Sequence, residues 1–232
     1  MKIIKYCIIC ARAGSKGVKN KNIVKLNNKL LIDYTIENAL KSKLFDKVII
    51  TTDIKKILKK YKSYKKLIIL KRRKKLSNDT SEKILSIRDA VLRVENTTRE
   101  KSSIVFDLDI TSPLRKIIDI KKAFKIFNKK NLDNLFSVNE SRKNPYFNMV
   151  EITKENKVKK IKKLQLTSIV RRQDAPKVFD MNASIYIWKR KVLFSKNYLF
   201  RKKTGIYIMP FKRSIDIDSK DDLSLVKHFK NK

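Results

Sequence analysis

Two glycines near the start of the chain stand out, because the 232 residues contain only three. Gly14 and Gly17 directly follow an apolar run, and glycine lets a backbone turn tightly and present its N–H groups to an anion. This composition favours phosphate binding over a plain turn with solvated lysines. The spacing fits neither G-x-x-x-x-G-K-[ST] nor G-x-G-x-x-G, which argues against a Walker A loop and a dinucleotide site. The surrounding basic residues are Arg12, Lys16, Lys19 and Lys21.

A pair of aspartates near the other end of the chain has metal-binding potential. Asp216 and Asp218 alternate with isoleucines, and the i, i+2 spacing on an extended segment puts both carboxylates on one face. Two converging carboxylates together with phosphate oxygens form a suitable Mg²⁺ site. The same spacing also fits an exposed edge strand with alternating acids, so the pair alone leaves both interpretations open.

Other reactive residue types have plainer interpretations. Cys7 and Cys10 form C-x-x-C inside an apparently buried strand, and we interpret them as core residues because zinc requires four ligands. His228 is the single histidine, which disfavours a Ser-His-Asp hydrolase. Asp53 follows an apolar strand and is expected to cap the next helix.

Short apolar runs alternate with helical patterns, which predicts the elements that position these groups. The β-α-β-α order predicts an α/β fold with a mostly parallel, Rossmann-like sheet covered on both faces. Ligands bind such sheets beyond the carboxyl ends of the strands, where the glycine turn lies. We interpret residues 1–232 as one domain with an insertion arm around 141–176. Strands are expected at Ile3–Cys10, Lys47–Thr52, Leu67–Leu70, Ile104–Asp109, Asn134–Val138, Ala183–Trp188 and Ile206–Met209, and helices at Leu31–Ser42, Ile54–Tyr61, Thr80–Val94, Ile117–Phe127 and Asp222–Phe229.

The charge and composition limit the class of protein. A formal net charge of +37 raises the alternative of a basic nucleic-acid-binding module without catalysis. The lysines are spread over the whole chain, however, which favours a biased composition. No stretch approaches the roughly 18 apolar residues of a membrane span, and no signal peptide is recognised. We therefore expect a soluble, cytoplasmic protein without membrane association and without a specific nucleic-acid partner.

Several segments together resemble one family. The run from Cys10 to Asn22, C-A-R-A-G-S-K-G-V-K-N-K-N, resembles the signature of the CMP-nonulosonate synthetases, which include the CMP-N-acetylneuraminate and CMP-legionaminate synthetases. Matching segments follow in the correct order at residues 72–81, 108–115, 171–176, 181–186 and 214–218. The resemblance covers Ile3 to Val226. It implies a three-layer α/β/α nucleotidyltransferase that uses CTP and Mg²⁺ to activate a nine-carbon acidic sugar, in a homodimer to which residues 141–176 contribute.

The resemblance also assigns roles to individual residues. Arg12, Lys21 and Asp216 are the implied catalytic residues, with Asp216 and Asp218 as metal ligands. Asp109 stands where sialic acid enzymes have a sugar-contacting Gln, which looks more like the CMP-legionaminate branch. Pseudaminate and Kdo remain alternative sugars. The implied nucleotide contacts are Arg12, Gly14, Ser15, Lys16, Gly17, Lys21, Asn22, Arg72 and Ser81, and the implied sugar contacts are Asp109, Thr111, Ser112, Arg172, Asn182, Tyr186 and Phe200.

Overall fold

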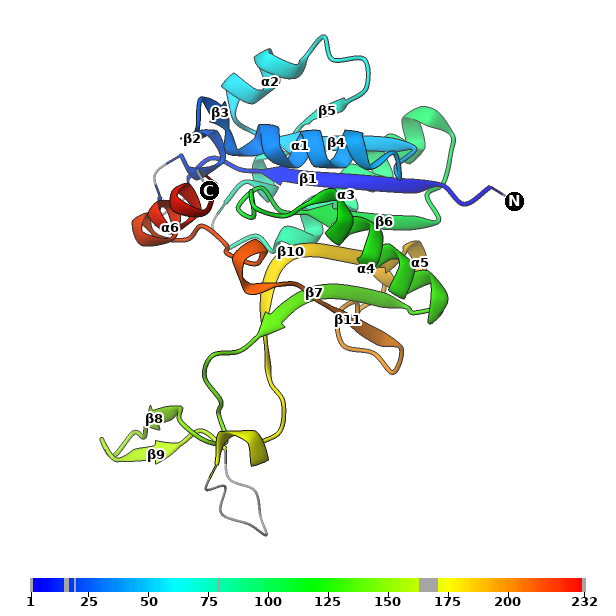
Figure 1. Ribbon diagram of the computed structural model, residues 1–232. Helices are drawn as coiled ribbons and strands as arrows, with labels where there is room; N and C mark the ends of the chain where they lie inside the picture. Colours follow the sequence, from blue (N-terminus) through cyan, green and yellow to red (C-terminus); the bar gives the residue numbers. More distant parts are fainter. Residues whose placement is uncertain (1, 15–16, 19, 79, 163–170, 231–232) are drawn as a thin grey trace.

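The fold is built on a seven-stranded sheet with the strand order β11-β7-β10-β6-β1-β4-β5 (Figure 1). The computed structural model describes residues 2–14, 17–18, 20–78, 80–162 and 171–230. Strands β5, β4, β1 and β6 are parallel to one another, β11 is parallel to β7, and β10 runs antiparallel between β6 and β7. The strands are β1 (Lys5–Ala11), β4 (Lys47–Thr52), β5 (Ile68–Lys71), β6 (Ile104–Leu108), β7 (Asn134–Glu140), β10 (Phe179–Lys189) and β11 (Thr204–Ile208).

Helices cover both faces of this sheet and bury two separate cores. The alternation of β1 illustrates the arrangement, because Tyr6 and Ile8 join one core while Cys7 and Ile9 join the other. Helices α3 and α5 pack on the first core, and α1, α2, α4 and α6 contribute to the second. The predicted three-layer α/β/α architecture is thus confirmed. The helices are α1 (Leu31–Ser42), α2 (Lys55–Tyr61), α3 (Lys83–Thr98), α4 (Ile117–Lys129), α5 (Arg190–Leu193) and α6 (Lys220–Lys230).

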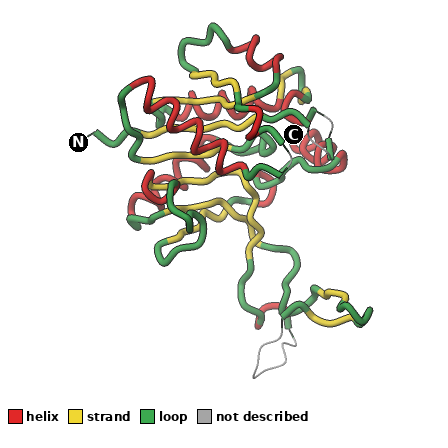
Figure 2. Tube along the Cα trace, turned by 180° about the vertical axis from the view of Figure 1, so that it is seen from behind, coloured by secondary structure: helices red, strands yellow, loops and turns green. Residues whose placement is uncertain are grey.

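The remaining elements are small. Two short strands, β2 (Lys25–Leu26) and β3 (Lys29–Leu30), form a hairpin ahead of α1. A second hairpin, β8 (Val150–Ile152) with β9 (Val158–Lys160), projects from the body on the segments that leave β7 and enter β10 (Figures 1 and 2). Among the described helices, none is both long enough and apolar enough to cross a membrane.

The last helix brings the end of the chain close to its beginning. Ser219 and Asp222 form a reciprocal cap, because the Asp222 carboxylate accepts from the Ser219 amide at 2.8 Å and the Asp222 amide donates to the Ser219 hydroxyl at 3.2 Å. This cap fixes the start of α6 at Lys220, two residues after Asp218. Figure 1 shows α6 beside the loop that follows β1.

Candidate active site

A cavity of about 490 Å³ opens at the carboxyl ends of β1 and β6. Its wall combines residues from the first 22 positions with residues from the last 20. The loop that contains Gly14 and Gly17, called the glycine loop, and the pair Asp216 and Asp218, called the late aspartates, therefore share one site. Most of the predicted nucleotide and metal residues line it, although they are scattered over the sequence. The lining residues are Cys10, Arg12, Gly17, Lys21, Asn22, Arg72, Ser81, Lys83, Ser86, Asp109, Thr111, Asp216 and Asp218.

Long-range hydrogen bonds shape the glycine loop. Gly14 has a φ of 79°, a left-handed conformation that glycine adopts without a steric penalty. The Ala13 amide donates to the Asp53 carboxylate at 2.8 Å, and the Asn22 side chain donates to the Arg12 carbonyl at 2.8 Å. The expectation that Asp53 caps a helix is wrong, since α2 begins after Ile54 and has no side-chain cap. Asp53 instead stabilises the loop by accepting the hydrogen bond from the Ala13 amide.

Gly17 packs directly against the segment that holds the late aspartates. A Cβ atom at this position would collide with the backbone carbonyl of Asp218. The loop can therefore pack against the aspartate segment only because residue 17 has no side chain. Lys21 reinforces the contact, because its ammonium lies 2.8 Å from an Asp218 carboxylate oxygen. The structure therefore requires glycine at position 17 for close packing.

We predict that Gly17→Ala weakens CTP binding by roughly tenfold or more. The added methyl forces the loop away from Asp218, and overpacking of this kind costs about 1–3 kcal/mol. The dissociation constant for CTP is measured by titration calorimetry. Gly205→Ala is the matched control, because the three atoms nearest to its Cβ all belong to the side chain of Leu132, and neither residue lines the cavity. Equal CTP affinity in the Gly17 variant and the wild type would contradict the close packing.

The aspartate segment is anchored by its middle residue. Ile217 is fully buried, and its amide donates to the Thr111 carbonyl at 3.0 Å. The carboxylates on either side line the cavity. Burial and the nearby charge of Asp109 raise the pKa of Asp216 to about 6. One oxygen of Asp216 is buried without a hydrogen-bond partner among the described residues, so this carboxylate can still accept a cation or a donor.

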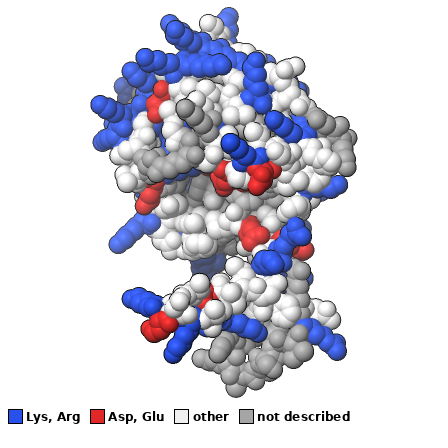
Figure 3. Space-filling model, turned by 90° about the vertical axis from the view of Figure 1, so that its left-hand side faces the viewer, with Lys and Arg blue, Asp and Glu red and all other residues white. Residues whose placement is uncertain are grey.

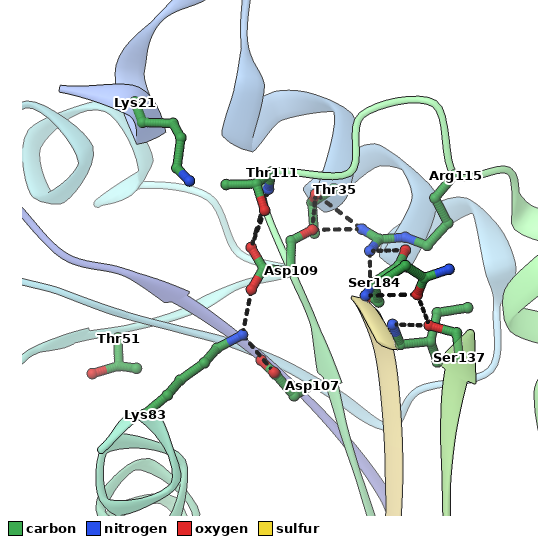
Figure 4. Close-up of polar contacts among 12 residues, drawn as sticks. Lys21, Thr35, Thr51, Lys83, Asp107, Asp109, Thr111, Arg115, Ser137 and Ser184 are labelled. Carbon is green, nitrogen blue, oxygen red and sulfur yellow. Dashed lines mark hydrogen bonds and ion pairs between the residues drawn. The ribbon is translucent and has the colours of Figure 1, made fainter. Parts of the chain in front are cut away.

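Lys83, which the sequence analysis did not identify, occupies the centre of the polar wall (Figure 4). It is the first residue of α3, and its ammonium lies 2.6 Å from the carboxylates of both Asp107 and Asp109. The other Asp109 oxygen accepts from the Thr111 amide and hydroxyl at 3.1 and 2.9 Å. Burial opposes ionisation, but Lys83 and Thr111 together hold the pKa of Asp109 well below its usual range. Asp109 is therefore an ionised and oriented acceptor.

Arg115 is a second residue whose role the sequence did not reveal. Its side chain is almost fully buried beneath the site and joins three elements. It donates to the Ser184 carbonyl at 2.6 Å, the Thr35 hydroxyl at 3.0 Å and the Asp109 carbonyl at 3.0 Å (Figure 4). These bonds hold the irregular part of β10, the helix α1 and the end of β6 in one arrangement.

Only part of the set of residues expected to contact the sugar lines the cavity. The side-chain oxygen Oδ1 of Asn182 accepts from the Ser137 hydroxyl at 2.6 Å, and the side-chain nitrogen Nδ2 of Asn182 is buried without a partner among the described residues. Ser112 is also buried, and its hydroxyl has no described partner. Asp109 and Thr111 line the cavity itself, whereas Ser112 and Asn182 do not.

The two predicted aromatic contacts belong to one cluster. Phe136 lies between Tyr186 and Phe200, with ring centroids 6.1 and 5.9 Å away. Tyr186 also stacks on Trp188, while Phe200 is 63% exposed. Neither Tyr186 nor Phe200 lines the cavity. Ser15, Lys16 and the side chain of Arg172 lie outside the described residues.

Comparison with known proteins identifies the family of this chain. Residues 6–232 match the family model described as Cytidylyltransferase. The chain is 44% identical over 221 residues to a Campylobacter jejuni protein named CMP-N,N'-diacetyllegionaminic acid synthase, covering 95% of this chain and 92% of that protein. It is equally similar, with the same coverage, to a Campylobacter coli protein named post-translational flagellin modification protein B.

A solved structure with the same fold is a CMP:2-keto-3-deoxy-manno-octonic acid synthetase complexed with CTP. It has a TM-score of 0.66 and 15% sequence identity, covering 98% of both chains. At this identity the likeness concerns the fold alone, whereas the family match spans nearly the whole sequence. From the family match and the close relatives, this chain belongs to the cytidylyltransferase family.

Proposed function

We propose that the protein transfers CMP from CTP to a nine-carbon acidic sugar of the N-acetylneuraminate or legionaminate type. The observation that carries this proposal is the shared cavity, in which a cationic glycine loop faces two carboxylates. The relatives named above add the sugar class, because one of them is named for CMP-N,N'-diacetyllegionaminic acid synthesis. A legionaminate-type sugar is the preferred substrate, and pseudaminate and Kdo are the alternatives.

In the proposed reaction the anomeric hydroxyl oxygen of the sugar attacks the α-phosphorus of CTP. The new O–P bond forms as the bond from the α-phosphorus to pyrophosphate breaks, and the hydroxyl proton is released. Such transfers depend on positioning and charge neutralisation. Arg12 and Lys21 line the cavity and would neutralise phosphate charge, and Arg72 and Ser81 line the same cavity and would contact the nucleoside. The backbone of Gly14 and Gly17 brings the loop close to the phosphates.

Magnesium fits the residues at the late aspartates. Asp216 offers a buried oxygen without a described partner, and Asp218 lines the same cavity. Among the described residues, no group of three or more His, Cys, Asp or Glu side chains is arranged to hold a metal ion alone. Phosphate oxygens and water would therefore complete the coordination, as Mg²⁺ prefers. When bound, the ion neutralises phosphate charge and polarises the α-phosphate.

The sugar would lie next to Asp109, on the side of β10. Asp109 and Thr111 present oriented polar groups to the cavity, and Ser112 and Asn182 carry buried polar atoms without described partners. Tyr186 and Phe200 would add apolar contact, and Arg172 would hold the sugar carboxylate in a bidentate pair. Tyr146 and Phe147 stand near the position where sialic acid enzymes have a Lys, which supports a legionaminate-type sugar.

We further propose a cytoplasmic homodimer in which the 141–176 segment crosses to the other subunit. The hairpin β8–β9 supports this, because Val150, Ile152 and Val158 are 61%, 69% and 69% exposed. Apolar side chains gathered on a projecting arm are typical of a contact surface. Sedimentation analysis of the wild type and of Ile152→Lys would test the dimer.

A pyrophosphate-release assay tests the proposed function. The purified protein is incubated with CTP, Mg²⁺ and one sugar at a time: N,N'-diacetyllegionaminate, N-acetylneuraminate, pseudaminate or Kdo. We expect the highest kcat/KM with the legionaminate sugar and no pyrophosphate without a sugar. Absence of pyrophosphate with every acidic sugar would contradict the enzyme assignment.

The alternative of a nucleic-acid-binding module has little structural support. In Figure 3 the Lys and Arg side chains are densest at the top of the visible face and scattered over the rest, with Asp and Glu among them, and they form no single stripe. A steep salt dependence of DNA or RNA binding, combined with no CTP-dependent activity, would favour that alternative.

A further inference from the structure

We propose that Lys83 is a catalytic residue that binds the α-phosphate of the nucleotide, with Asp107 and Asp109 holding its ammonium in place. This inference rests on the proposed function, because it adds a contact to the same nucleotide site. Lys83 begins α3, two residues after Ser81, and reaches across the cavity wall to the end of β6 (Figure 4).

The hydrogen bonding of Lys83 leaves one donor for a ligand. An ammonium has three N–H donors. Two are directed to Asp107 and Asp109, each at 2.6 Å, and no other described residue accepts the third. The Lys83 side chain is 38% exposed, although both carboxylates that hold it are much more buried. The exposed part lies on the cavity wall, so the third N–H is available to a bound molecule.

The charge distribution indicates which molecule that is. Asp107 is 1% exposed and sits behind Lys83, whereas Asp109 and Asp216 add further negative charge to the same region. A polyanionic ligand would be repelled from these carboxylates unless a cation stood between them and the ligand. Lys83 stands at that point, and it remains protonated because Asp107 and Asp109 outweigh the effect of its burial and raise its pKa.

The position of Lys83 along the nucleotide selects the α-phosphate. In the proposed function Arg72 and Ser81 contact the nucleoside and Lys21 contacts the triphosphate tail, and all three residues line the cavity. Lys83 follows Ser81 by two residues, and its ammonium binds Asp109, the proposed sugar contact. Asp109 in turn accepts from Thr111, whose carbonyl accepts from the amide of Ile217, between the two proposed metal ligands. The phosphate nearest to both the nucleoside and the sugar is the α-phosphate, which is also the reacting centre. Its charge changes most during transfer, so a fixed ammonium there assists the reaction.

Binding of cytidine and CMP by wild type and Lys83→Met provides a test that does not depend on the sugar. The two ligands differ only in the α-phosphate. We expect the wild type to bind CMP at least tenfold more tightly than cytidine, and Lys83→Met to lose most of that preference. Lys75→Met, which changes an exposed lysine outside the cavity, should keep it. An unchanged preference in Lys83→Met, or no preference in the wild type, would overturn the proposal.

Kinetics with CTP and sugar separate a catalytic role from a structural one. Removal of an electrostatic contact to the transition state lowers kcat by about 10²- to 10³-fold. Lys83→Met also leaves Asp107 buried without its cation, so the double variant Lys83→Met with Asp107→Asn removes both charges. We expect the double variant to be as stable as the wild type but still slow, and Lys83→Arg to recover part of the rate. Wild-type kcat in the double variant would show that Lys83 only compensates Asp107. Such a result would leave the proposed function intact, because the wild type would still release pyrophosphate.

Discussion

Replacement of Asp216 by Asn is expected to abolish CMP-sugar formation and, in the absence of a metal, to increase the stability of the protein. Activity should fall by at least about 10³-fold, because the amide cannot neutralise a cation that holds phosphate charge. Stability should rise because the native carboxylate is partly buried near Asp109, which raises its pKa to about 6. Loss of function and gain of stability in one variant is typical of a site that stores electrostatic strain.

The stability effect has a defined pH window. The unfolded carboxyl group titrates near its ordinary pKa of 3.8, and the native group titrates near 6. The native state binds the proton more strongly, so the wild type loses stability as the pH rises from about 4 to 6. The loss is at most about 3 kcal/mol at 1.36 kcal/mol per pKa unit, and less because solvent reaches part of the side chain.

Melting temperatures recorded in EDTA between pH 4 and pH 8 check this expectation. The Asp216→Asn variant should match the wild type near pH 4 and melt a few degrees higher above pH 6. Glu155→Gln, an exposed acid on the arm, serves as the control and should show no such divergence. A wild-type protein that is more stable than the Asn variant at pH 7 would disagree with the assigned environment of Asp216.

Replacement of Arg115 by Met is expected to have the largest effect on stability. The buried guanidinium joins the Ser184 carbonyl, the Thr35 hydroxyl and the Asp109 carbonyl. Loss of the guanidinium leaves these buried acceptors unpaired and lowers the free energy of unfolding by about 3–5 kcal/mol. Urea denaturation followed by circular dichroism measures the change in the free energy of unfolding.

Arg115→Lys separates charge from geometry in that experiment. Lysine keeps the positive charge but lacks the planar fork that reaches three acceptors on different elements. We expect it to recover less than half of the lost stability. Full recovery by lysine would mean that the charge near Asp109, rather than the bridging of β6, α1 and β10, explains the burial of this arginine.

The sequence predicted the scaffold well because its elements have local signals. Apolar runs marked the strands, and β4 and α1 have the predicted bounds. The two glycines of the first loop and the Asp216–Asp218 pair were recognisable because glycine and acid are both scarce in this chain. The rule that parallel sheets bind ligands at the carboxyl ends of their strands placed the glycine loop at the site, and the family resemblance implied that the aspartates join it there.

The sequence could not reveal contacts that depend on where an element begins. The helix expected from Thr80 begins at Lys83, and this start brings the Lys83 ammonium onto Asp107 and Asp109. Asp53 was expected to act locally, but its carboxylate binds the Ala13 amide, 40 residues away in sequence. Arg115 belongs to a recognisable motif, yet its partners come from three elements that only the fold brings together. Such long-range pairs have no local signature.

The central claim is that the glycine loop and the late aspartates bind one nucleotide and one divalent cation together. Mn²⁺ used in place of Mg²⁺ tests it, because electron paramagnetic resonance measures the free ion directly. Titration with CTP should reduce the free Mn²⁺ signal more strongly with the wild-type protein than with Asp216→Asn combined with Asp218→Asn. If the double variant retained the same CTP-dependent loss of free Mn²⁺ as the wild type, the cation would bind elsewhere and the shared site would be contradicted.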